Sequence, residues 1–352
     1  MDFDNLGYGN ELQELAIAGE RKKISVIIPC YNAGFALDRC MESIVGQTIG
    51  MDSLEIILVN DASTDNTLEK LCEWEARYPD SIMVIDCKEN KKPGGARNIG
   101  MEYASGLYIS LIDADDVLEE NMYQALYEAA AEQCDLAICQ SSKDIDNVAG
   151  KDKNSLKEEK APHKRVIEIA SIQEQQAFLE EDYNMAVWNK LYLRDFLLNN
   201  NLKFKEGVMY EDSYFSELVK RYCKKVFITD EILYHHVLSK KSVSCDTNSK
   251  MNRIDYIEVH IALIEELRRR DIYEPFGNMY ANKFIIHYIS FMKSFEAVFG
   301  KMDAELEKII SNSIINLYPD YKEIPIVKSI MAAGQEENRK ILERLEAYAV
   351  SG

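Results

Sequence analysis

The chain has 352 residues, of which 47% are hydrophobic and 29% are charged, a composition typical of globular domains. Its 60 acidic residues outnumber the 41 basic ones, which gives a formal net charge of −19. A charge of this sign repels nucleic acids and anionic lipids, so we expect no nucleic-acid partner.

The N-terminal residues 1–22 are predicted to form a helical lead-in before the first strand. They lack the basic-then-apolar order of a signal peptide, and no run in the chain approaches the ~20 apolar residues of a membrane span. The eight cysteines include no C-x-x-C pair, which favours free thiols in a reducing compartment. We therefore expect a cytoplasmic protein and leave open its peripheral association with the inner face of the membrane.

Apolar runs and helical patterns alternate from Lys23 onwards. Strands are predicted at 24–29, 54–61, 82–86, 107–113 and 136–140. Helices are predicted between them at 36–48, 67–78, 95–104 and 121–133. Since the strands lack alternating polar residues and are separated by helices, they indicate a largely parallel sheet covered on both faces.

The second half of the chain changes in character. Residues 141–165 are polar and of mixed charge, which predicts a solvated loop or insertion. Helical patterning resumes in 187–204 and 211–228, and from about Lys250 the sequence predicts almost continuous helix. We expect three parts, namely the lead-in, a domain over 23–248 and a helical C-terminal region over 249–352.

Polar clusters follow three of the predicted strands: "CYNAG" after the first, "NDASTDNT" after the second and "DADD" after the fourth. In such sheets ligands bind at the carboxyl ends of the strands, so these clusters predict one site. Neither a P-loop nor the G-x-G-x-x-G fingerprint is present. The segment "PGGARN" allows close approach at a helix start, where Arg97 could reach a phosphate.

The "DADD" segment predicts a divalent-cation site. Asp113 and Asp115 supply hard oxygen ligands that suit Mg²⁺ or Mn²⁺, whereas Asp116 is expected to begin the next helix. The segment also fits the nucleophile motif of haloacid-dehalogenase-type phosphatases. In that fold the motif belongs to the first strand, whereas three strand–helix units precede it here, and this makes the phosphatase the weaker alternative.

Four segments together resemble the family 2 nucleotide-sugar glycosyltransferases over residues 23–245: "KISVIIPCYNAGFALDRCMESIVGQT", "LEIILVNDASTDNT", "GGARNIGMEYASGLYISLIDADD" and "EDSYF". The resemblance implies an α/β protein of the GT-A fold, with a mostly parallel Rossmann-like sheet between helices and a helical C-terminal extension. It divides the domain into a nucleotide-binding half, 23–140, and an acceptor half, 165–248.

The activity implied by the resemblance is inverting transfer of a hexosyl or N-acetylhexosaminyl group from a nucleotide sugar, expected to be a UDP-sugar. The acceptor would be a hydroxyl of a carbohydrate or lipid-linked molecule in cell-surface polysaccharide synthesis. Residues of the family's nucleotide site match Pro29, Tyr31, Asn32, Asp61, Arg97 and Asp113. Asp61 would accept a hydrogen bond from the base, and Asp113 would contact the ribose.

Asp115 matches the family's metal ligand, with Mn²⁺ or Mg²⁺ as the expected cofactor, and His235 or His236 is the candidate to complete the metal shell. The acid pair of the family matches Glu211, expected to orient the acceptor, and Asp212, the expected base. Candidates for contacts along the donor or acceptor wall are Trp188, Asp116 and Lys241.

A different reading is a non-catalytic nucleotide-sugar-binding scaffold on the same fold. The presence of the acid pair argues against it, because a binding module has no need of a base. The helical C-terminal region could form a homo-oligomer, dock the protein to a membrane-bound partner or cover the sheet, and the sequence does not decide among these roles.

Overall fold

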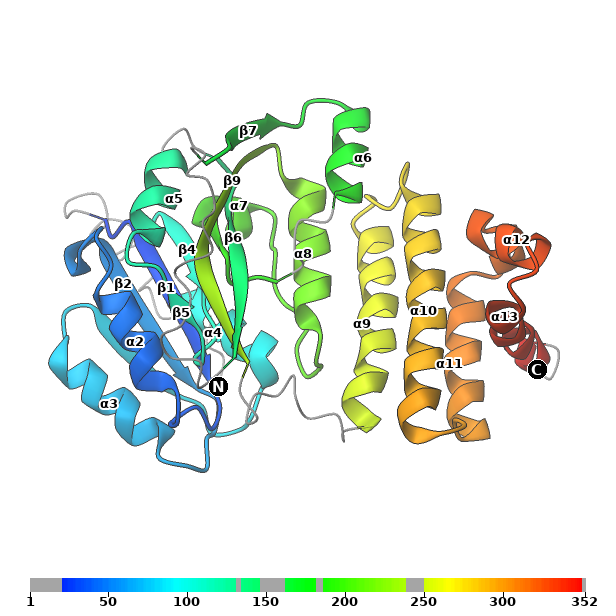
Figure 1. The fold of residues 1–352 in the computed structure, drawn as a ribbon, viewed down its shortest axis with the longest axis horizontal. Coiled ribbons are helices and arrows are strands. Elements are labelled where there is room, and N and C mark those ends of the chain that lie inside the picture. The colour runs from blue at the N-terminus through cyan, green and yellow to red at the C-terminus, as the bar shows by residue number, and fades with distance from the viewer. Residues whose placement is uncertain (1–20, 131–133, 146–161, 182–185, 239–249, 350–352) are drawn as a thin grey trace, which may run out of the picture. The chain divides into compact units, whose positions relative to one another are not determined.

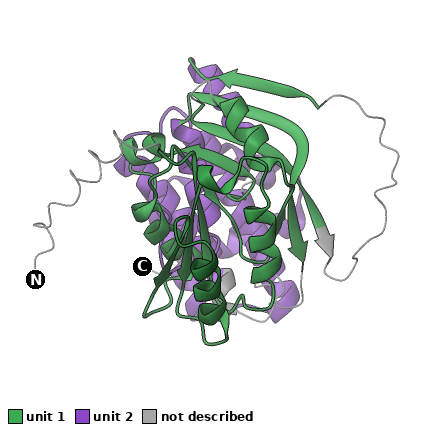
Figure 2. Ribbon diagram, turned by 90° about the vertical axis from the view of Figure 1, so that its left-hand side faces the viewer, with its two compact units in different colours: residues 1–170, 186–203, 223–242 green, residues 171–185, 204–222, 243–352 purple. Residues whose placement is uncertain are grey.

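The computed structural model describes residues 21–130, 134–145, 162–181, 186–238 and 250–349 (Figure 1). The chain divides into two compact units, which Figure 2 distinguishes by colour. The sheet unit comprises residues 1–170, 186–203 and 223–242, and the helical unit comprises 171–185, 204–222 and 243–352. Segments 171–185 and 204–222, which the sequence analysis grouped with the sheet domain, cluster with the C-terminal helices.

The sheet unit begins with four parallel strands in the spatial order β3-β2-β1-β4, which are β1 (Ile24–Cys30), β2 (Leu54–Asn60), β3 (Ile82–Asp86) and β4 (Tyr108–Leu111). The helices that connect them are α2 (Leu37–Val45), α3 (Thr67–Arg77) and α4 (Lys92–Tyr103), with a short 3₁₀ turn at Met51–Ser53. Parallel neighbours require such crossover helices, and the predicted α/β alternation is confirmed.

The described sheet continues to nine strands with β5 (Val117–Leu118), β6 (Leu136–Ile145), β7 (Lys164–Glu168), β8 (Lys190–Leu193) and β9 (Lys225–Leu238). Strand β8 is antiparallel to β4 and β6, whereas β9 is parallel to β6 and antiparallel to β5 and β7. Helices α5 (Met122–Ala130) and α7 (Arg194–Asn199) follow β5 and β8.

Part of the helical patterning predicted for the second half is wrong. Strand β8 lies within 187–204, and β9 begins at Lys225, inside the predicted helix 211–228. Short apolar runs such as "KLYL" and "KVFI" do not distinguish strand from helix, and here pairing with β4 and β6 decides. The ends of the predicted 141–165 loop are also strand, because β6 reaches Ile145 and β7 starts at Lys164.

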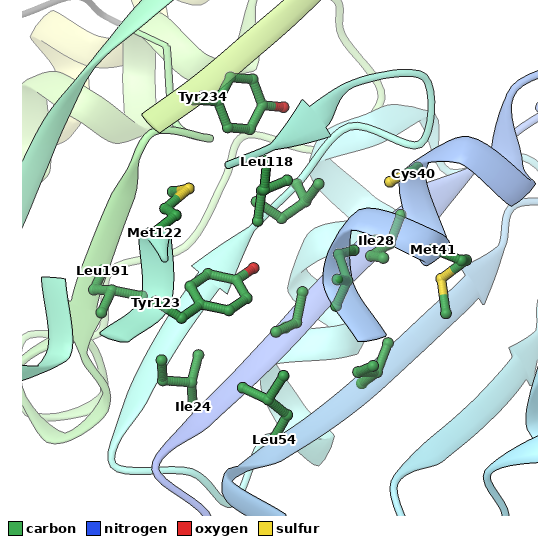
Figure 3. Packing of buried hydrophobic residues seen from close by; sticks show 14 of the residues in the cluster. Ile24, Ile28, Cys40, Met41, Leu54, Leu118, Met122, Tyr123, Leu191 and Tyr234 are labelled. Carbon is green, nitrogen blue, oxygen red and sulfur yellow. The ribbon is translucent and has the colours of Figure 1, made fainter. Parts of the chain in front are cut away.

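Alternate residues of the central strands face opposite sides of the sheet. Ile24, Val26 and Ile28 of β1 belong to a core cluster with residues of α2, α3 and α5, part of which Figure 3 shows. Within this core the Tyr108 hydroxyl donates to the Ala130 carbonyl at 2.7 Å, and the Tyr123 hydroxyl donates to Ser110 Oγ at 3.1 Å. The large buried rings therefore keep their polar ends paired.

The helical unit contains seven described α-helices: α6 (Ile172–Glu180), α8 (Glu211–Tyr222), α9 (Lys250–Arg269), α10 (Gly277–Phe299), α11 (Ala304–Leu317), α12 (Pro325–Ala332) and α13 (Glu336–Ala349), and a 3₁₀ turn at Tyr321–Glu323. Helix α9 packs against α8, α10 and α11, and α13 packs against α10, α11 and α12. The prediction of almost continuous helix after Lys250 is confirmed. Among the described helices, none has the length and apolar character that crossing a membrane requires.

A steric contact on the opposite side of β1 from the core cluster yields a test of the packing. A Cβ added at Gly100 of α4 would overlap Cγ2 of Ile27. Without such a clash, a Gly→Ala substitution within a helix stabilises a protein by about 1 kcal/mol. A destabilising effect would therefore indicate the contact with Ile27. We expect Gly100→Ala to destabilise the protein by about 1–3 kcal/mol in urea unfolding. In a double-mutant cycle with Ile27→Ala the two changes should compensate in part, and strict additivity would contradict this packing.

Candidate functional site

The polar segments that follow β1, β2 and β4 lie at one edge of the sheet unit, because the three strands are parallel neighbours. Pro29 is part of β1, and Tyr31 follows it with 50% of its surface exposed. Asn32 has a φ of 51° and joins two loops, since its Oδ1 accepts from the Thr64 N–H at 2.8 Å. The β1–α2 loop is thereby fixed while the Tyr31 ring remains accessible to a ligand.

Asp61 is the first residue after β2, and only 2% of its surface is exposed. Its carboxylate accepts the Lys91 backbone N–H at 2.6 Å, and its own carbonyl accepts from the Asn90 side chain at 3.1 Å. Burial raises the pKa of Asp61, although the N–H groups of Lys91 and Lys92 act in the opposite direction. Such a carboxylate gains from a further N–H donor on a ligand.

Arg97 of α4 forms an ion pair with Asp113, with 2.6 Å between Nη2 and Oδ1. The Arg97 side chain is 5% exposed, whereas that of Asp113 is 31% exposed. Because the guanidinium, carried by the second turn of α4, is fixed beside the aspartate, it compensates part of the charge of the "DADD" turn. The residue predicted to reach a phosphate is thus placed against the residue predicted to contact the ribose.

Asp115 is half-buried, and its backbone carbonyl accepts from Arg39 Nη2 at 2.8 Å. The carbonyl of Asp113 accepts from the Asp116 N–H at 3.2 Å and from the Cys40 thiol at 3.6 Å. Over the described residues, no group of three or more His, Cys, Asp or Glu side chains is placed to hold a metal ion. A carboxylate such as that of Asp115 fits Mg²⁺ or Mn²⁺ when the ligand supplies further oxygens, as phosphates do.

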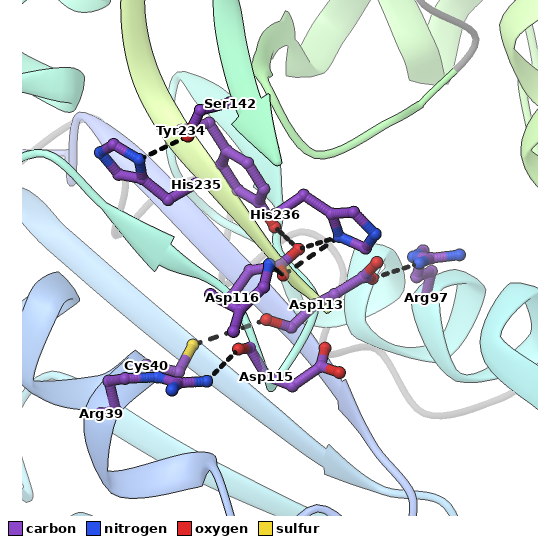
Figure 4. Close-up of polar contacts among 11 residues, drawn as sticks. Arg39, Cys40, Arg97, Asp113, Asp115, Asp116, Ser142, Tyr234, His235 and His236 are labelled. Carbon is purple, nitrogen blue, oxygen red and sulfur yellow. Dashed lines mark hydrogen bonds and ion pairs between the residues drawn. The ribbon is translucent and has the colours of Figure 1, made fainter. Parts of the chain in front are cut away.

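Asp116 does not begin a helix, so that prediction is wrong. It lies in the turn before β5, and its side chain is 0% exposed. Its carboxylate accepts from the Tyr234 hydroxyl at 2.5 Å, the Val237 N–H at 2.8 Å and His236 Nδ1 at 3.2 Å (Figure 4). Burial raises the pKa of Asp116, and its hydrogen bond raises the pKa of His236. Asp116 therefore anchors the turn to β9 from the interior of the sheet unit.

The two adjacent histidines on β9 have different surroundings, as neighbours on a strand should. The ring of His235 lies 2.7 Å from Glu119 Oε1 through Nε2 and 2.7 Å from Ser142 Oγ through Nδ1. The ring of His236 faces Asp116 and stacks on Trp188 with 5.6 Å between centroids. His236 is thus the histidine beside the aspartates (Figure 4).

Trp188, predicted to line a donor or acceptor wall, is half-buried and also stacks on Tyr234 with 4.3 Å between centroids. Its indole therefore packs against Tyr234 and His236, the two aromatic partners of Asp116, as a core tryptophan would, while retaining some exposed surface. Lys241, the other predicted wall residue, lies outside the described residues.

Glu211 and Asp212 belong to the helical unit, where they form the first turn of α8. Glu211 is buried, whereas Asp212 is half-buried and accepts the Ser213 N–H at 2.8 Å. A carboxylate in the first turn of a helix is stabilised by the helix dipole. The preceding Tyr210 has a φ of 65°, which turns the chain sharply into the helix.

Sequence reasoning missed Arg39 and Tyr234. Tyr234 immediately precedes the histidine pair, so a strand assignment for 225–238 would have placed it on the same side as His236. Arg39 lies in a helix, α2, and carries no signal in the sequence, because its partner is a backbone carbonyl 76 residues away.

Several known proteins resemble this chain in sequence or in fold. The model of the family "Glycosyl transferase family 2" matches residues 25–198. The uncharacterized glycosyltransferase YibD of Escherichia coli is 30% identical over 266 residues, covering 75% of this chain and 74% of that protein. The poly(ribitol-phosphate) beta-glucosyltransferase of Bacillus spizizenii is 32% identical over 117 residues, which are 33% of this chain and 18% of that protein.

Among solved structures, S. aureus TarS (residues 1–349) in complex with UDP-GlcNAc superposes with a TM-score of 0.68. The match covers 94% of this chain and 91% of that one, at 19% sequence identity. Similarity at this level of identity establishes the shared fold, which extends through the sheet and the C-terminal helices. The predicted α/β fold with a helical extension is confirmed.

Removal of the Asp116 carboxylate should destabilise the sheet unit. Asp116→Ala leaves the Tyr234 hydroxyl and the Val237 N–H buried without an acceptor, and we expect a loss of about 3 kcal/mol or more in urea unfolding. Tyr234→Phe removes one hydrogen bond and should cost about 1 kcal/mol. Glu119→Gln, at the half-exposed partner of His235, is the matched control and should have little effect. Equal stability of Asp116→Ala and Glu119→Gln would contradict the support role.

Proposed function

Since the chain belongs to glycosyl transferase family 2, we propose that it transfers a sugar from a UDP-sugar to a hydroxyl of a carbohydrate or lipid-linked acceptor, with inversion at the anomeric carbon. The observation that carries this proposal is the gathering of Asp61, Arg97 and the "DADD" aspartates at the carboxyl edge of one parallel sheet. The phosphatase alternative is wrong, because the matched family is a transferase family and the aspartates follow the fourth strand.

The donor nucleotide would occupy the edge formed by the loops after β1 and β2. The exposed Tyr31 ring can stack on a base, and the buried Asp61 carboxylate can accept a ring N–H, which uracil offers. Asp113, held by Arg97, is suited to the ribose hydroxyls. A UDP-sugar is favoured because the TarS structure that shares the fold contains UDP-GlcNAc.

The diphosphate would lie beside Asp115, which is the residue we propose to hold a divalent cation together with phosphate oxygens. His236, which contacts Asp116, is the candidate for a further ligand. When bound, Mg²⁺ or Mn²⁺ supplies Lewis-acid stabilisation of the charge on the departing nucleoside diphosphate. The ion pair of Arg97 with Asp113 limits the repulsion between the turn and the phosphates.

Inversion by direct displacement requires a base that removes the proton of the acceptor hydroxyl as it attacks the anomeric carbon. We assign this role to Asp212, the half-buried residue of the α8 acid pair, and give the buried Glu211 the task of orienting the acceptor. The surface-polysaccharide context is favoured by the poly(ribitol-phosphate) beta-glucosyltransferase among the similar proteins. A non-catalytic nucleotide-sugar-binding scaffold is the second candidate, and it would need no base at this position.

Substitution of the proposed base separates these two candidates. Asp212→Asn should lower the release of UDP from UDP-glucose, UDP-galactose or UDP-N-acetylglucosamine by about 10²- to 10⁴-fold, measured with water as the acceptor. Binding of UDP should be unaffected. The matched control is Asp303→Asn, which changes the N-cap of α11 in the same unit to another good capping residue. A scaffold would bind UDP, show no turnover and respond equally to both substitutions.

Dependence on the metal is tested by thermal unfolding with UDP. We expect UDP to raise the unfolding temperature substantially more in the presence of Mn²⁺ than in EDTA, because binding to the native state stabilises it in proportion to ln(1 + [L]/Kd). Asp115→Asn should abolish the metal-dependent part of the shift, whereas Asp80→Asn, at an exposed position, should retain it. A UDP shift identical in EDTA and Mn²⁺ would exclude the metal role of Asp115.

A further inference from the structure

The helical unit contains a cavity of about 340 Å³, which we call the helical pocket. It is lined by one face of α8, α9 and α10 and by the C-terminal end of α6. The lining positions recur at helical spacing, as Ser213, Glu217 and Lys220 on α8 illustrate. This volume is at the lower end of the range found for pockets that bind small molecules.

The walls of the helical pocket are largely apolar and aromatic. Val259, Leu263 and Ile264 of α9 face Tyr280 and Phe284 of α10, and all five are buried. Surfaces of this kind pack against the C–H faces of a ring or an alkyl chain. They give the pocket affinity for a ligand that is itself partly apolar.

Two of the residues that line this pocket each carry a buried polar atom that has no hydrogen-bond partner among the described residues. Glu217 is 6% exposed, and Lys283 pairs with its Oε1 at 3.1 Å, whereas Oε2 has no partner. The Tyr280 hydroxyl, on a side chain that is 2% exposed, has none either. Because an unpaired buried polar group costs about 1–3 kcal/mol, these atoms favour a ligand that can hydrogen-bond to them.

A pair of histidines adds a third acceptor. The Tyr256 carbonyl lies 2.7 Å from His260 Nδ1, so this nitrogen must carry the proton and Nε2 of the neutral ring must accept. His287 Nδ1, at 2.6 Å from that Nε2, is then the donor, which leaves His287 Nε2 as an acceptor. Burial lowers the pKa of His260 to about 4 and also lowers the pKa of His287, so both rings are neutral at pH 7.

The basic side chains of the helical pocket are engaged with the protein. Lys283 donates to the Leu179 carbonyl at 3.0 Å in addition to its pairing with Glu217, and Lys220 donates to the Glu181 carbonyl at 2.9 Å. Glu180 and Glu181 add negative charge to the lining. This arrangement disfavours a phosphate and favours neutral hydroxyl groups as the donors to Glu217 and His287.

The pocket also adjoins the proposed base. Ser213, which lines it, directly follows Asp212 in the first turn of α8. Burial raises the pKa of the lining residue Tyr256, and the negative charge of Asp212 adds to this effect after that of Tyr210. The carboxylate of Asp212 is therefore near the end of the pocket that Ser213 and Tyr256 form.

We propose that the helical pocket binds a neutral sugar residue of the acceptor, with its ring against the apolar walls and its hydroxyls donating to Glu217 and His287. This inference rests on the proposed function, because it assigns the acceptor side of the same reaction. A sugar ring combines apolar C–H faces with several hydroxyl donors, which are the two properties that the pocket complements.

The binding step can be tested without any transfer reaction. Methyl glucoside, methyl galactoside and methyl N-acetylglucosaminide are titrated into the full-length protein while the ring signals of its histidines are followed by NMR. We expect at least one glycoside to shift the signals of His260 and His287, assigned by substitution, and ribitol 5-phosphate to shift them less. Absence of any shift with all three glycosides, or a larger shift with the phosphate, would overturn the proposal.

Variants locate the binding. Glu217→Gln keeps the shape of the side chain, removes its charge and should weaken glycoside binding about tenfold, the effect of one buried charged hydrogen bond. Glu258→Gln, an exposed position on α9 outside the pocket, is the matched control and should bind as the unchanged protein does. His287→Leu serves as a second variant, and thermal unfolding verifies that each variant is folded.

The outcomes distinguish this inference from the proposed function. Equal glycoside affinity for Glu217→Gln and Glu258→Gln, with UDP release intact, would overturn the pocket assignment and leave the transferase proposal standing. Glycoside binding that requires Glu217 in a protein that never releases UDP from any donor would support the pocket as a sugar site and count against the transferase proposal.

Discussion

The buried carboxylate of Asp116 is the contact on which the candidate donor site depends. It joins the turn after β4 to β9 by accepting from Tyr234, His236 and Val237, which lie about 120 residues further along the chain. A charge without exposed surface is tolerated only where donors surround it. Breaking these contacts would leave a buried charge without donors, which is energetically costly. The turn therefore keeps one conformation, and this conformation sets the positions of Asp113 and Asp115.

The three aspartates of this turn show how like charges can be placed together without mutual destabilisation. Asp116 is compensated by donors in the interior, and Asp113 is compensated by Arg97. Asp115 is the member whose carboxylate is suited to a cation brought together with a phosphorylated ligand. An overall charge of −19 adds to the need for such a cation, because a diphosphate must otherwise approach an acidic protein.

The sequence predicted that the polar segments after β1, β2 and β4 meet at one sheet edge, because the determinants of this arrangement are local. Apolar runs specify β1 to β4, and a polar segment directly after a buried strand can lie only at the sheet edge. The partners of Asp116 on β9 could not be predicted in this way, because they are set by the pairing of β5 and β6 with β9. Long-range pairing also explains why β8 and β9 were predicted as helix. The choice between His235 and His236 depends on the same strand assignment, because only a strand places the two rings on opposite sides.

The match to the family ends at residue 198. It therefore includes Asp61, Arg97, Asp113 and Asp115, which we place on the donor side, whereas α8 and most of the lining of the helical pocket lie beyond it. Such a division is what the proposed reaction requires, since a UDP-sugar presents the same nucleotide to every enzyme that uses it while acceptors differ. Selection among acceptors needs a surface that can vary in shape without disturbing the nucleotide contacts. A pocket between helices meets this requirement, because its lining changes with single side chains at helical spacing while the sheet edge keeps its geometry.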